Sequence, residues 1–350
     1  MTKKRTVVVM IPRKITGGVR TIVAKLIEGL SLEGFNVKPI TYSLGIDLIQ
    51  SLKMMPNICN CGAIIYTSSI PILGHIPHSK CTRTVLFVHG YTKYQLLNSL
   101  SHGNVFSIYI MGLWKIAKVA RKIHKYICLC KTACEINGIQ ENYIILPEFI
   151  FPGEAELYEK ISKRLRENNH RDVVRIITYT SHVTSPRLLN VRYVERLVKI
   201  IGKRINKKLE LVIINPRIKS EIINLSGNVI IRHIRYLPRI EFFGLVTNSD
   251  LFIELNIDEE LRDATIEAAL LLTPVAKLTH PELKDRCDYS EDDLIHAYSF
   301  NELIEKLLEY IRNIEVYRPI YSKRLRNFII RNRAWNAVKK QLVYYLREDT

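Results

Sequence analysis

The stretch NSDLFIELNIDEELRDATIEAALLLTPVAKLTH, residues 248–280, joins an apolar run to a cluster of acids and a helical pattern. The run LFIELN has the length and composition of a buried strand, and the apolar spacing after it predicts a helix that begins near Arg262 or Asp263. The segment TPVAKL predicts the next strand. Because parallel strands joined through helices end at the same edge of a sheet, the acids should lie where open α/β folds bind ligands.

The same alternation of apolar runs and helical patterns extends outward to both ends of the chain. TVVVMI, FNVKPITY, AIIYTSS, TVLFVHG, KYICLC and YIILPEF predict strands in the first half, and VVRIITYTS, LELVIIN and NVIIRHI precede LFIELN in the second. We expect an α/β protein with two Rossmann-like, doubly wound parallel-sheet domains that face each other across a cleft. The expected parts are an N-terminal domain, a polar connection, a C-terminal domain and a terminal helix packing back across the domains, over residues 1–151, 152–172, 173–318 and 319–350.

The composition is that of a soluble globular protein, with 47% hydrophobic and 25% charged residues in 350. No apolar run approaches the roughly 20 residues of a membrane-spanning helix, and the run before Pro12 is shorter than a secretory signal core of about 7 to 15 residues. We therefore expect a cytoplasmic protein. The seven cysteines include no Cys-x-x-Cys pair, which favours reduced core thiols over a metal site.

The positive charge is concentrated in the first half, where residues 1–150 hold 18 Lys and Arg against 6 Asp and Glu. Such an excess favours an anionic partner, which is a membrane surface, a phosphorylated substrate or nucleic acid. One helical stripe in this half is typical of a helix that lies on an anionic membrane, and its residues are Trp114, Lys115, Lys118, Lys122 and Lys125. The alternative is a helix that packs on the sheet and exposes a solvated basic face.

Two features of the first half stand at the ends of predicted strands. Gly17 and Gly18 follow the first strand and open a helix, so that the backbone can turn close to a ligand and aim amides at it. Neither a three-glycine dinucleotide fingerprint nor a Walker loop is present, and a tight turn is the alternative. His89 ends the strand in TVLFVHG, where its ring can act as donor, acceptor or acid, or serve the structure alone.

The acids of the opening stretch form a spaced pair, Glu259 in the loop and Glu267 about one turn into the helix. A carboxylate near the first helical turns can accept two hydroxyls of a ribose or a sugar. The helix amides near Asp263 and Ala264, together with the helix dipole, can receive phosphates beside it. The alternative is an acidic helix start that only favours the dipole.

This stretch resembles the donor-binding signature of the retaining glycosyltransferases of family 4, which have the GT-B fold. The resemblance rests on the Glu-x7-Glu pair with Glu267-Ala268, on the Thr273-Pro274-Val275 that starts the next strand, and on Gly17-Gly18 and Trp335 in matching order. It implies that Glu259 holds sugar hydroxyls, that Glu267 holds the ribose, and that His89 contacts the sugar or acceptor near the transferred bond. No metal is required in this reading.

Two departures from the family pattern concern the donor diphosphate. Where the family has Arg and, five residues later, Lys, this chain has His182 and Arg187. The family's Gly-Phe-Gly after the first Glu is replaced by Glu260-Leu261-Arg262, where Arg262 compensates by charge or donor binding is altered. The implied donor-binding set is Gly17, Gly18, His182, Arg187, Arg262, Asp263, Ala264 and Glu267, and the catalytic set is His89, Arg187 and Glu259.

The expected function is transfer of a sugar, of hexosyl type, from a nucleotide-sugar to a lipid, glycan or protein acceptor with retained anomeric configuration. The alternative is a GT-B-like binding protein without transfer activity, whose basic half holds nucleic acid or another anionic partner. The sequence contains no helix-turn-helix, RNA-recognition or zinc-finger pattern, and it lacks the glycine fingerprint of a nicotinamide-dependent enzyme.

Overall fold

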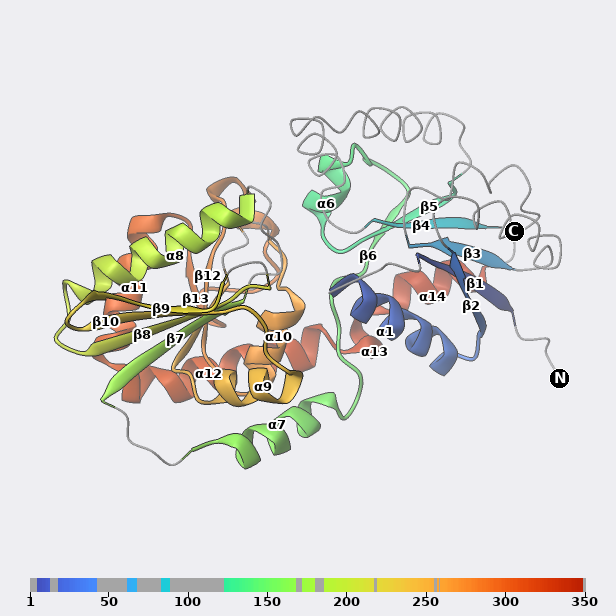
Figure 1. Ribbon diagram of the computed structural model, residues 1–350. Helices are drawn as coiled ribbons and strands as arrows, with labels where there is room; N and C mark the ends of the chain where they lie inside the picture. Colours follow the sequence, from blue (N-terminus) through green and yellow to red (C-terminus); the bar gives the residue numbers. More distant parts are fainter. Residues whose placement is uncertain are drawn as a thin grey trace. The chain divides into compact units, whose positions relative to one another are not determined.

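Figure 1 shows the computed structural model of the chain. It describes residues 5–12, 18–42, 62–67, 83–88, 123–167, 172–179, 186–216, 219–254, 257 and 259–348. The chain divides into two compact units. Unit 1 comprises residues 1–149 and 335–350, and unit 2 comprises residues 150–334.

The described part of unit 1 is built on a six-stranded sheet in the order β2-β1-β3-β4-β5-β6. Every neighbouring pair in it is parallel. The strands β1, β3, β4 and β5 are near-continuous buried apolar runs, as in sheets covered on both faces, whereas β2 at the edge of the described sheet is largely exposed. Their bounds are β1 Thr6–Pro12, β2 Asn36–Tyr42, β3 Ala63–Tyr66, β4 Thr84–Val88, β5 Lys125–Cys128 and β6 Tyr143–Ile145.

The described helices of unit 1 are α1 Gly18–Leu32, α6 Lys131–Ile136, α13 Trp335–Val338 and α14 Lys340–Arg347. Trp335 is buried against α1, where a Cβ added at Gly29 would lie 2.7 Å from the indole ring. The indole also packs on Phe149, with 4.8 Å between ring centres. Glycine at this position therefore allows the C-terminal segment to pack closely on the first helix.

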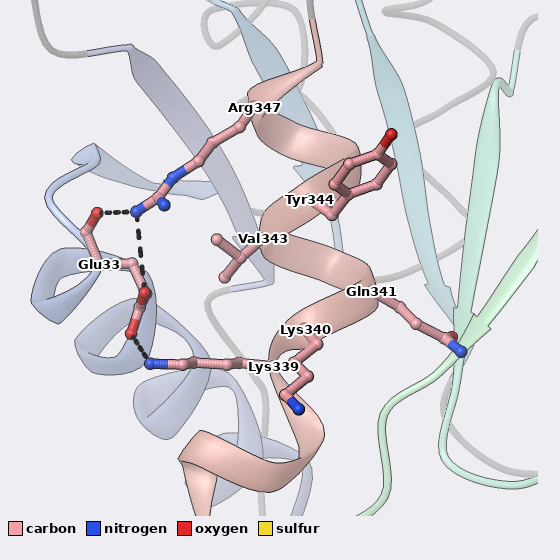
Figure 2. Close-up of a pocket in the computed structure, with 7 residues that line it drawn as sticks. All are labelled: Glu33, Lys339, Lys340, Gln341, Val343, Tyr344 and Arg347. Carbon is pink, nitrogen blue, oxygen red and sulfur yellow. Dashed lines mark hydrogen bonds and ion pairs between the residues drawn. The ribbon is translucent and has the colours of Figure 1, made fainter.

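Charged groups hold α14 to the end of α1. The Glu33 carboxylate lies 2.5 Å from the Lys339 ammonium and accepts a hydrogen bond from the Trp335 indole at 3.3 Å, while the Arg347 guanidinium donates to the Glu33 carbonyl at 2.8 Å. Figure 2 shows the pocket of about 550 Å³ beside these contacts. Its lining residues are Glu33, Lys339, Lys340, Gln341, Val343, Tyr344 and Arg347, and none of them belongs to the acid pair.

Unit 2 contains a seven-stranded sheet in the order β13-β12-β11-β7-β8-β10-β9. All of its pairs are parallel except β10 with β9, which is antiparallel at the sheet's edge. Its strands are β7 Val173–Tyr179, β8 Lys208–Ile214, β9 Glu221–Ser226, β10 Val229–Ile234, β11 Leu251–Glu254, β12 Val275–Leu278 and β13 Ile295–Ala297.

Helices cover both faces of this sheet (Figure 1). One face carries α8 Pro186–Gly202 and α11 Phe300–Arg312. The other carries α9 Arg239–Thr247, α10 Asp263–Leu270 and α12 Ile314–Asn332, with α7 Glu154–Leu165 packed on α9 and α10. A short 3₁₀ helix, η3 Pro281–Arg286, follows β12.

The two doubly wound parallel sheets expected from the sequence are present, with local differences. The edge strand β9 and the short β13 were not predicted. The stretch 152–172, expected as a partly helical connection, contains the helix α7, and it belongs to unit 2, where Tyr158 is buried. The stretch 319–350 is divided among α12 in unit 2 and α13 and α14 in unit 1.

The expectation that all core thiols are reduced was wrong for one pair. Cys128 ends β5 and Cys134 lies in α6, and the turn between them brings their Cα atoms to 5.8 Å, within disulfide range. The two form a disulfide. Among the described residues, no helix is both long enough and apolar enough to cross a bilayer.

Candidate active site

The acid loop, residues 259–262, connects the region after β11 to the start of α10. Its two carboxylates are buried, with 4% of Glu259 and 2% of Glu260 exposed. Leu261 is fully buried in the cluster beneath α10 and anchors the loop. Arg262 lies 3.6 Å from the Glu260 carboxylate. Since an ionised carboxylate is costly to remove from water, two adjacent buried acids in a loop indicate a built environment for negative charge.

The helix α10 begins where the sequence predicted, at Asp263 with Arg262 as its N-cap residue. The N-cap side chain makes no capping hydrogen bond, and Asp263 and Ala264 are partly exposed. The first-turn amides of a helix carry partial positive charge and favour an anion beside them. This end of α10 therefore has the polarity that a phosphate group requires.

Glu267 is held by two residues that the sequence reasoning missed. The Arg239 guanidinium, from the start of α9, forms an ion pair with Oε1 of Glu267. The Tyr158 hydroxyl of α7 donates to the same oxygen at 3.4 Å and lies 3.3 Å from Arg239. Arg239 also lies over the Phe243 ring, 5.0 Å from its centre. Glu267, on α10, is thus oriented by residues from two other helices, α7 and α9.

The charge of Glu267 acts on neighbouring groups at the carboxyl end of β7 and on α7. Burial raises the pKa of Tyr179, the last residue of β7, and the charge of Glu267 raises it further. Burial and then Glu267 likewise raise the pKa of Tyr158. Burial is the largest influence on the pKa of Arg239 and lowers it, but Glu267 and Tyr158 together outweigh burial, so that the pKa of Arg239 is raised. The arginine remains a cation and Glu267 keeps its charge partner.

Several predicted site residues lie outside the described residues. They are Gly17, His89 and His182, the side chain of Arg187, and Trp114, Lys115, Lys118 and Lys122. Gly18 is the first residue of α1, and the backbone of Arg187 is in the first turn of α8. Of the predicted donor-binding residues with described side chains, the structure brings Arg262, Asp263, Ala264 and Glu267 together at one end of α10, with Glu259 in the same loop.

The position of Lys125 corrects the expected basic stripe. Lys125 is the first residue of β5 and so lies in a strand, where the stripe had been predicted to be helical. Its ammonium lies 5.5 Å from the centre of the Tyr345 ring. The segment KYIC forms a strand because its apolar residues are buried in the sheet of unit 1.

Within the described ranges, no group of three or more His, Cys, Asp or Glu side chains is arranged to hold a metal ion. Arg239 could not have been assigned to Glu267 from the sequence because the two are 28 residues apart. The only local signal was Pro238, which marks the start of α9 and so the place where a side chain can reach the same edge.

No protein-family profile and no curated protein sequence matches the chain. Solved structures match it over nearly its whole length. Sucrose-phosphate synthase from Thermosynechococcus elongatus has a TM-score of 0.64 at 11% identity and covers 98% of each chain. HepE from Anabaena, in complex with UDP-glucose, has a TM-score of 0.66 at 10% identity and covers 97% of this chain and 99% of its own.

A third structure, WaaG, a glycosyltransferase involved in lipopolysaccharide biosynthesis, has a TM-score of 0.61 at 11% identity and covers 98% of this chain and 100% of its own. These proteins have the GT-B fold of two Rossmann-like domains. Identity at this level shows the fold, and the fold class expected from the sequence is confirmed.

Proposed function

We propose that the chain is a retaining glycosyltransferase, which moves a sugar from a nucleotide-sugar donor to an acceptor. The observation that carries this proposal is the acid pair Glu259 and Glu267, set on either side of the α10 N-terminus at the carboxyl edge of the second Rossmann-like sheet. This edge is where open α/β sheets bind ligands. The HepE structure holds UDP-glucose in a fold of the same type, which supports a nucleotide-sugar as the ligand.

In this proposal each part of the site meets one part of the donor. Glu267, oriented by Arg239 and Tyr158, accepts hydrogen bonds from the ribose hydroxyls. The first-turn amides near Asp263 and Ala264 receive the diphosphate together with Arg262, Arg187 and His182. Glu259 holds hydroxyls of the sugar that is transferred.

The chemistry that the residues supply is stabilisation of the leaving group. A nucleoside diphosphate gains negative charge as the bond to the sugar breaks, and fixed amides and guanidinium groups stabilise that charge without reorganising. His89 contacts the sugar or the acceptor near the transferred bond. The proposed reaction requires no metal, so that activity should persist when divalent cations are chelated.

Unit 1 receives the acceptor in this proposal, which is a lipid, a glycan or a protein. Residues 1–150 contain 18 basic and 6 acidic residues, and this excess of positive charge favours an acceptor presented at an anionic surface. WaaG acts in lipopolysaccharide biosynthesis, and the TarM structure contains fondaparinux, α-GlcNAc-glycerol and UDP. Acceptors thus differ widely among proteins of this fold, so the acceptor has to be found by experiment.

The first test is a thermal-shift screen of the full chain against uridine, guanosine and adenosine diphosphates and their sugars. A ligand that binds the folded state stabilises it by RT ln(1 + [L]/Kd), about 2.7 kcal/mol at 100 times Kd. We expect one base to raise the melting temperature. Glu267→Ala should abolish most of that shift, whereas Glu241→Ala, an exposed acid in the first turn of α9, should leave it unchanged.

The second test separates transfer from binding alone. With the donor found in the screen, release of nucleoside diphosphate on adding an acceptor library would demonstrate transfer, and the anomeric proton of the product would report retention. Donor binding without any release would instead support a GT-B-like binding protein. No shift with any of the nucleotides would contradict the proposed function.

A further inference from the structure

Glu254 ends strand β11, which lies inside the sheet of unit 2 between β12 and β7. Its side chain is buried, with 8% of the residue exposed. Phe252, two residues earlier, packs in the cluster beneath α10, and alternate residues of a strand point to the same face of a sheet. The Glu254 carboxylate therefore lies on the α10 face, at the carboxyl end of a strand that is bonded to a neighbour on each side.

A hydrogen bond joins this carboxylate to the first turn of α10. The hydroxyl of Thr265, the third residue of α10, donates to it, and Thr265 is fully buried. A threonine hydroxyl within a helix often donates to a carbonyl of the preceding turn of its own helix. Here it donates instead to a strand residue 11 positions earlier in the chain. Because hydrogen bonds to an ionised carboxylate are roughly twice as strong as those between neutral groups, this bond holds the helix firmly to the sheet.

The Glu254–Thr265 hydrogen bond lies next to the amides proposed to receive the diphosphate. The Thr265 and Ile266 amides both donate to the Arg262 carbonyl at 2.9 Å. The helical amides ahead of these bonds belong to Asp263 and Ala264. Since the amides are part of the backbone, their direction is set by the direction of the whole first turn. A bond that fixes Thr265 therefore also fixes the direction of the amides that stabilise the phosphate charge.

The rest of α10 is held by other contacts. Glu267, about one turn further along, is bound by Arg239 and Tyr158. Three residues after the end of the helix, the Thr273 hydroxyl donates to the Val246 carbonyl at 2.8 Å. Loss of the Glu254–Thr265 hydrogen bond should therefore loosen the first turn and leave the proposed ribose contact at Glu267 in place.

We propose that Glu254 and Thr265 are positioning residues for the donor diphosphate, whose hydrogen bond fixes the first turn of α10 so that its amides point at the phosphates. This inference rests on the proposed function and adds to it two residues that touch no substrate. It makes a specific statement about the donor: the Thr265 hydroxyl should matter for the diphosphate and hardly at all for the nucleoside. A threonine that only stabilises the fold would affect both alike.

The experiment compares ligands with and without phosphates on the full-length protein. Affinities for UDP, GDP and ADP are measured by calorimetry, and those for uridine, guanosine and adenosine by ligand-observed NMR. For the base that binds, we expect Thr265→Val to weaken the diphosphate by about tenfold, because displaced amides lose much of their stabilisation, and the nucleoside by less than about twofold. Thr265→Ser keeps the hydroxyl and should bind both ligands like wild type. Equal weakening of both ligands by Thr265→Val, or the same defect in Thr265→Ser, would overturn the proposal.

The matched control is Thr273→Val, which also removes a buried hydroxyl that donates a hydrogen bond, but beyond the other end of α10. We expect it to lower the melting temperature about as much as Thr265→Val and to leave the affinity for the diphosphate unchanged. If Thr273→Val weakened the diphosphate as much as Thr265→Val, general loosening of unit 2 would explain the defect and the proposal would be wrong.

A second variant covers the case in which Thr265→Val does not fold. Thr265→Ala removes the same hydroxyl but leaves room for a water beside the Glu254 carboxylate, so it is better tolerated than valine. We expect the same selective loss for the diphosphate. Wild-type affinity for the diphosphate in folded Thr265→Val or Thr265→Ala would overturn this inference alone. A wild type that binds none of the six ligands would contradict the proposed function itself, and this inference with it.

Discussion

The two sheets of this chain are both doubly wound and largely parallel, but their strands bury side chains of different polarity. In the described strands β1 to β6 of unit 1, the buried residues are apolar or aromatic apart from Thr84 and the cysteine of the disulfide. In unit 2, neighbouring strands bury Glu254, Lys277 and His296. Both sheets are doubly wound and largely parallel, so this kind of sheet does not need these charges. Buried polar groups reduce stability unless they have hydrogen-bond or charge partners. Their presence in unit 2 therefore indicates that the functional site lies at the edge of that sheet.

The acid pair shows the same contrast on a smaller scale. Glu259 is buried in a loop, whereas Glu267 lies on a helix and is oriented by Arg239, whose side chain is 60% exposed. Two identical side chains eight positions apart thus have different supports. Because their surroundings differ, we expect substitutions at Glu259 and at Glu267 to impair ligand binding in different ways.

The largest expected effect concerns the apolar unit. Trp335→Ala removes the largest fully buried side chain and leaves a cavity against Gly29 and Phe149. Large-to-small core substitutions of this size cost about 3 to 5 kcal/mol. We expect the free energy of unfolding of unit 1 to fall by this amount. Hydrogen exchange in denaturant should show it as faster exchange of the backbone amides in strands β1 to β6. The exchange of β7 and β8 in unit 2 should change little.

The control for this variant is Tyr344→Ala, because Tyr344 belongs to the same C-terminal segment but is 69% exposed. Surface substitutions usually change stability by less than about 0.5 kcal/mol. If Trp335→Ala and Tyr344→Ala destabilised unit 1 equally, packing of the C-terminal segment would not be what holds it. If both units lost protection together, they would behave as one cooperative body.

The second prediction concerns Glu267 and its support. Glu267→Ala should weaken nucleotide binding by about 1 to 3 kcal/mol, the cost of leaving ribose hydroxyls without their acceptor. Arg239→Ala should produce a smaller loss, because Tyr158 still holds the carboxylate. The measurement is calorimetry with the nucleotide found in the thermal-shift screen and with its 2′-deoxy form.

The discriminating result is the ratio of affinities for the ribose and deoxyribose forms. Glu267→Ala should bring that ratio toward one, whereas a substitution that merely loosens α10 would weaken both forms alike. A folded Glu267→Ala variant with wild-type affinity would remove the ribose assignment.

The third prediction uses His296 to test whether the polar edge of unit 2 limits stability in acid. Its folded pKa of about 4 lies below the ordinary value of about 6.5. Between these pH values the unfolded chain binds a proton that the folded chain does not, so the free energy of unfolding falls as the pH drops from about 6.5 to about 4. His296→Gln should remove this component and flatten the pH dependence by about 1 to 2 kcal/mol over the window. Parallel curves for the two proteins from denaturant titrations would contradict the assignment.

The parts of the fold that the sequence predicts correctly depend on local patterns. The buried strands are recognisable because parallel sheets require continuous apolar runs, and α10 begins at Asp263 as the periodicity indicates. The edge strand β9 escapes this reasoning because it is polar and half solvated, with Ile222 64% exposed. The stretch 152–172 was expected as a partly helical connection and does contain α7, but its place in unit 2 depends on contacts with α9 and α10, which come much later in the chain.

The candidate site divides in the same way. The Glu259 and Glu267 spacing is local and could be recognised, but the partners of these acids depend on contacts between distant segments. Arg239 reaches Glu267 from another helix, and Lys277 meets Glu254 only through the register of β11 and β12. Register is a property of the folded sheet, and no spacing in the sequence states it.

The smallest expected effect concerns the basic charge of unit 1, and it compares the two units directly. We expect weak, reversible binding to anionic liposomes through Lys115, Lys118 and Lys122, since Lys125 belongs to β5. Each lysine near an anionic surface contributes on the order of 1 kcal/mol, and raising salt from about 0.05 to 0.5 M shortens the Debye length from roughly 14 to 4 Å, so co-sedimentation should disappear across that series. Glu at these three positions should abolish it. Glu at Lys199, Lys203 and Lys208, three exposed lysines of unit 2, makes the same change in net charge and should leave binding intact. Equal loss in both variants would mean that net charge alone attracts the protein, and a wild type that stays in solution at low salt would mean that the basic stripe is a solvated surface.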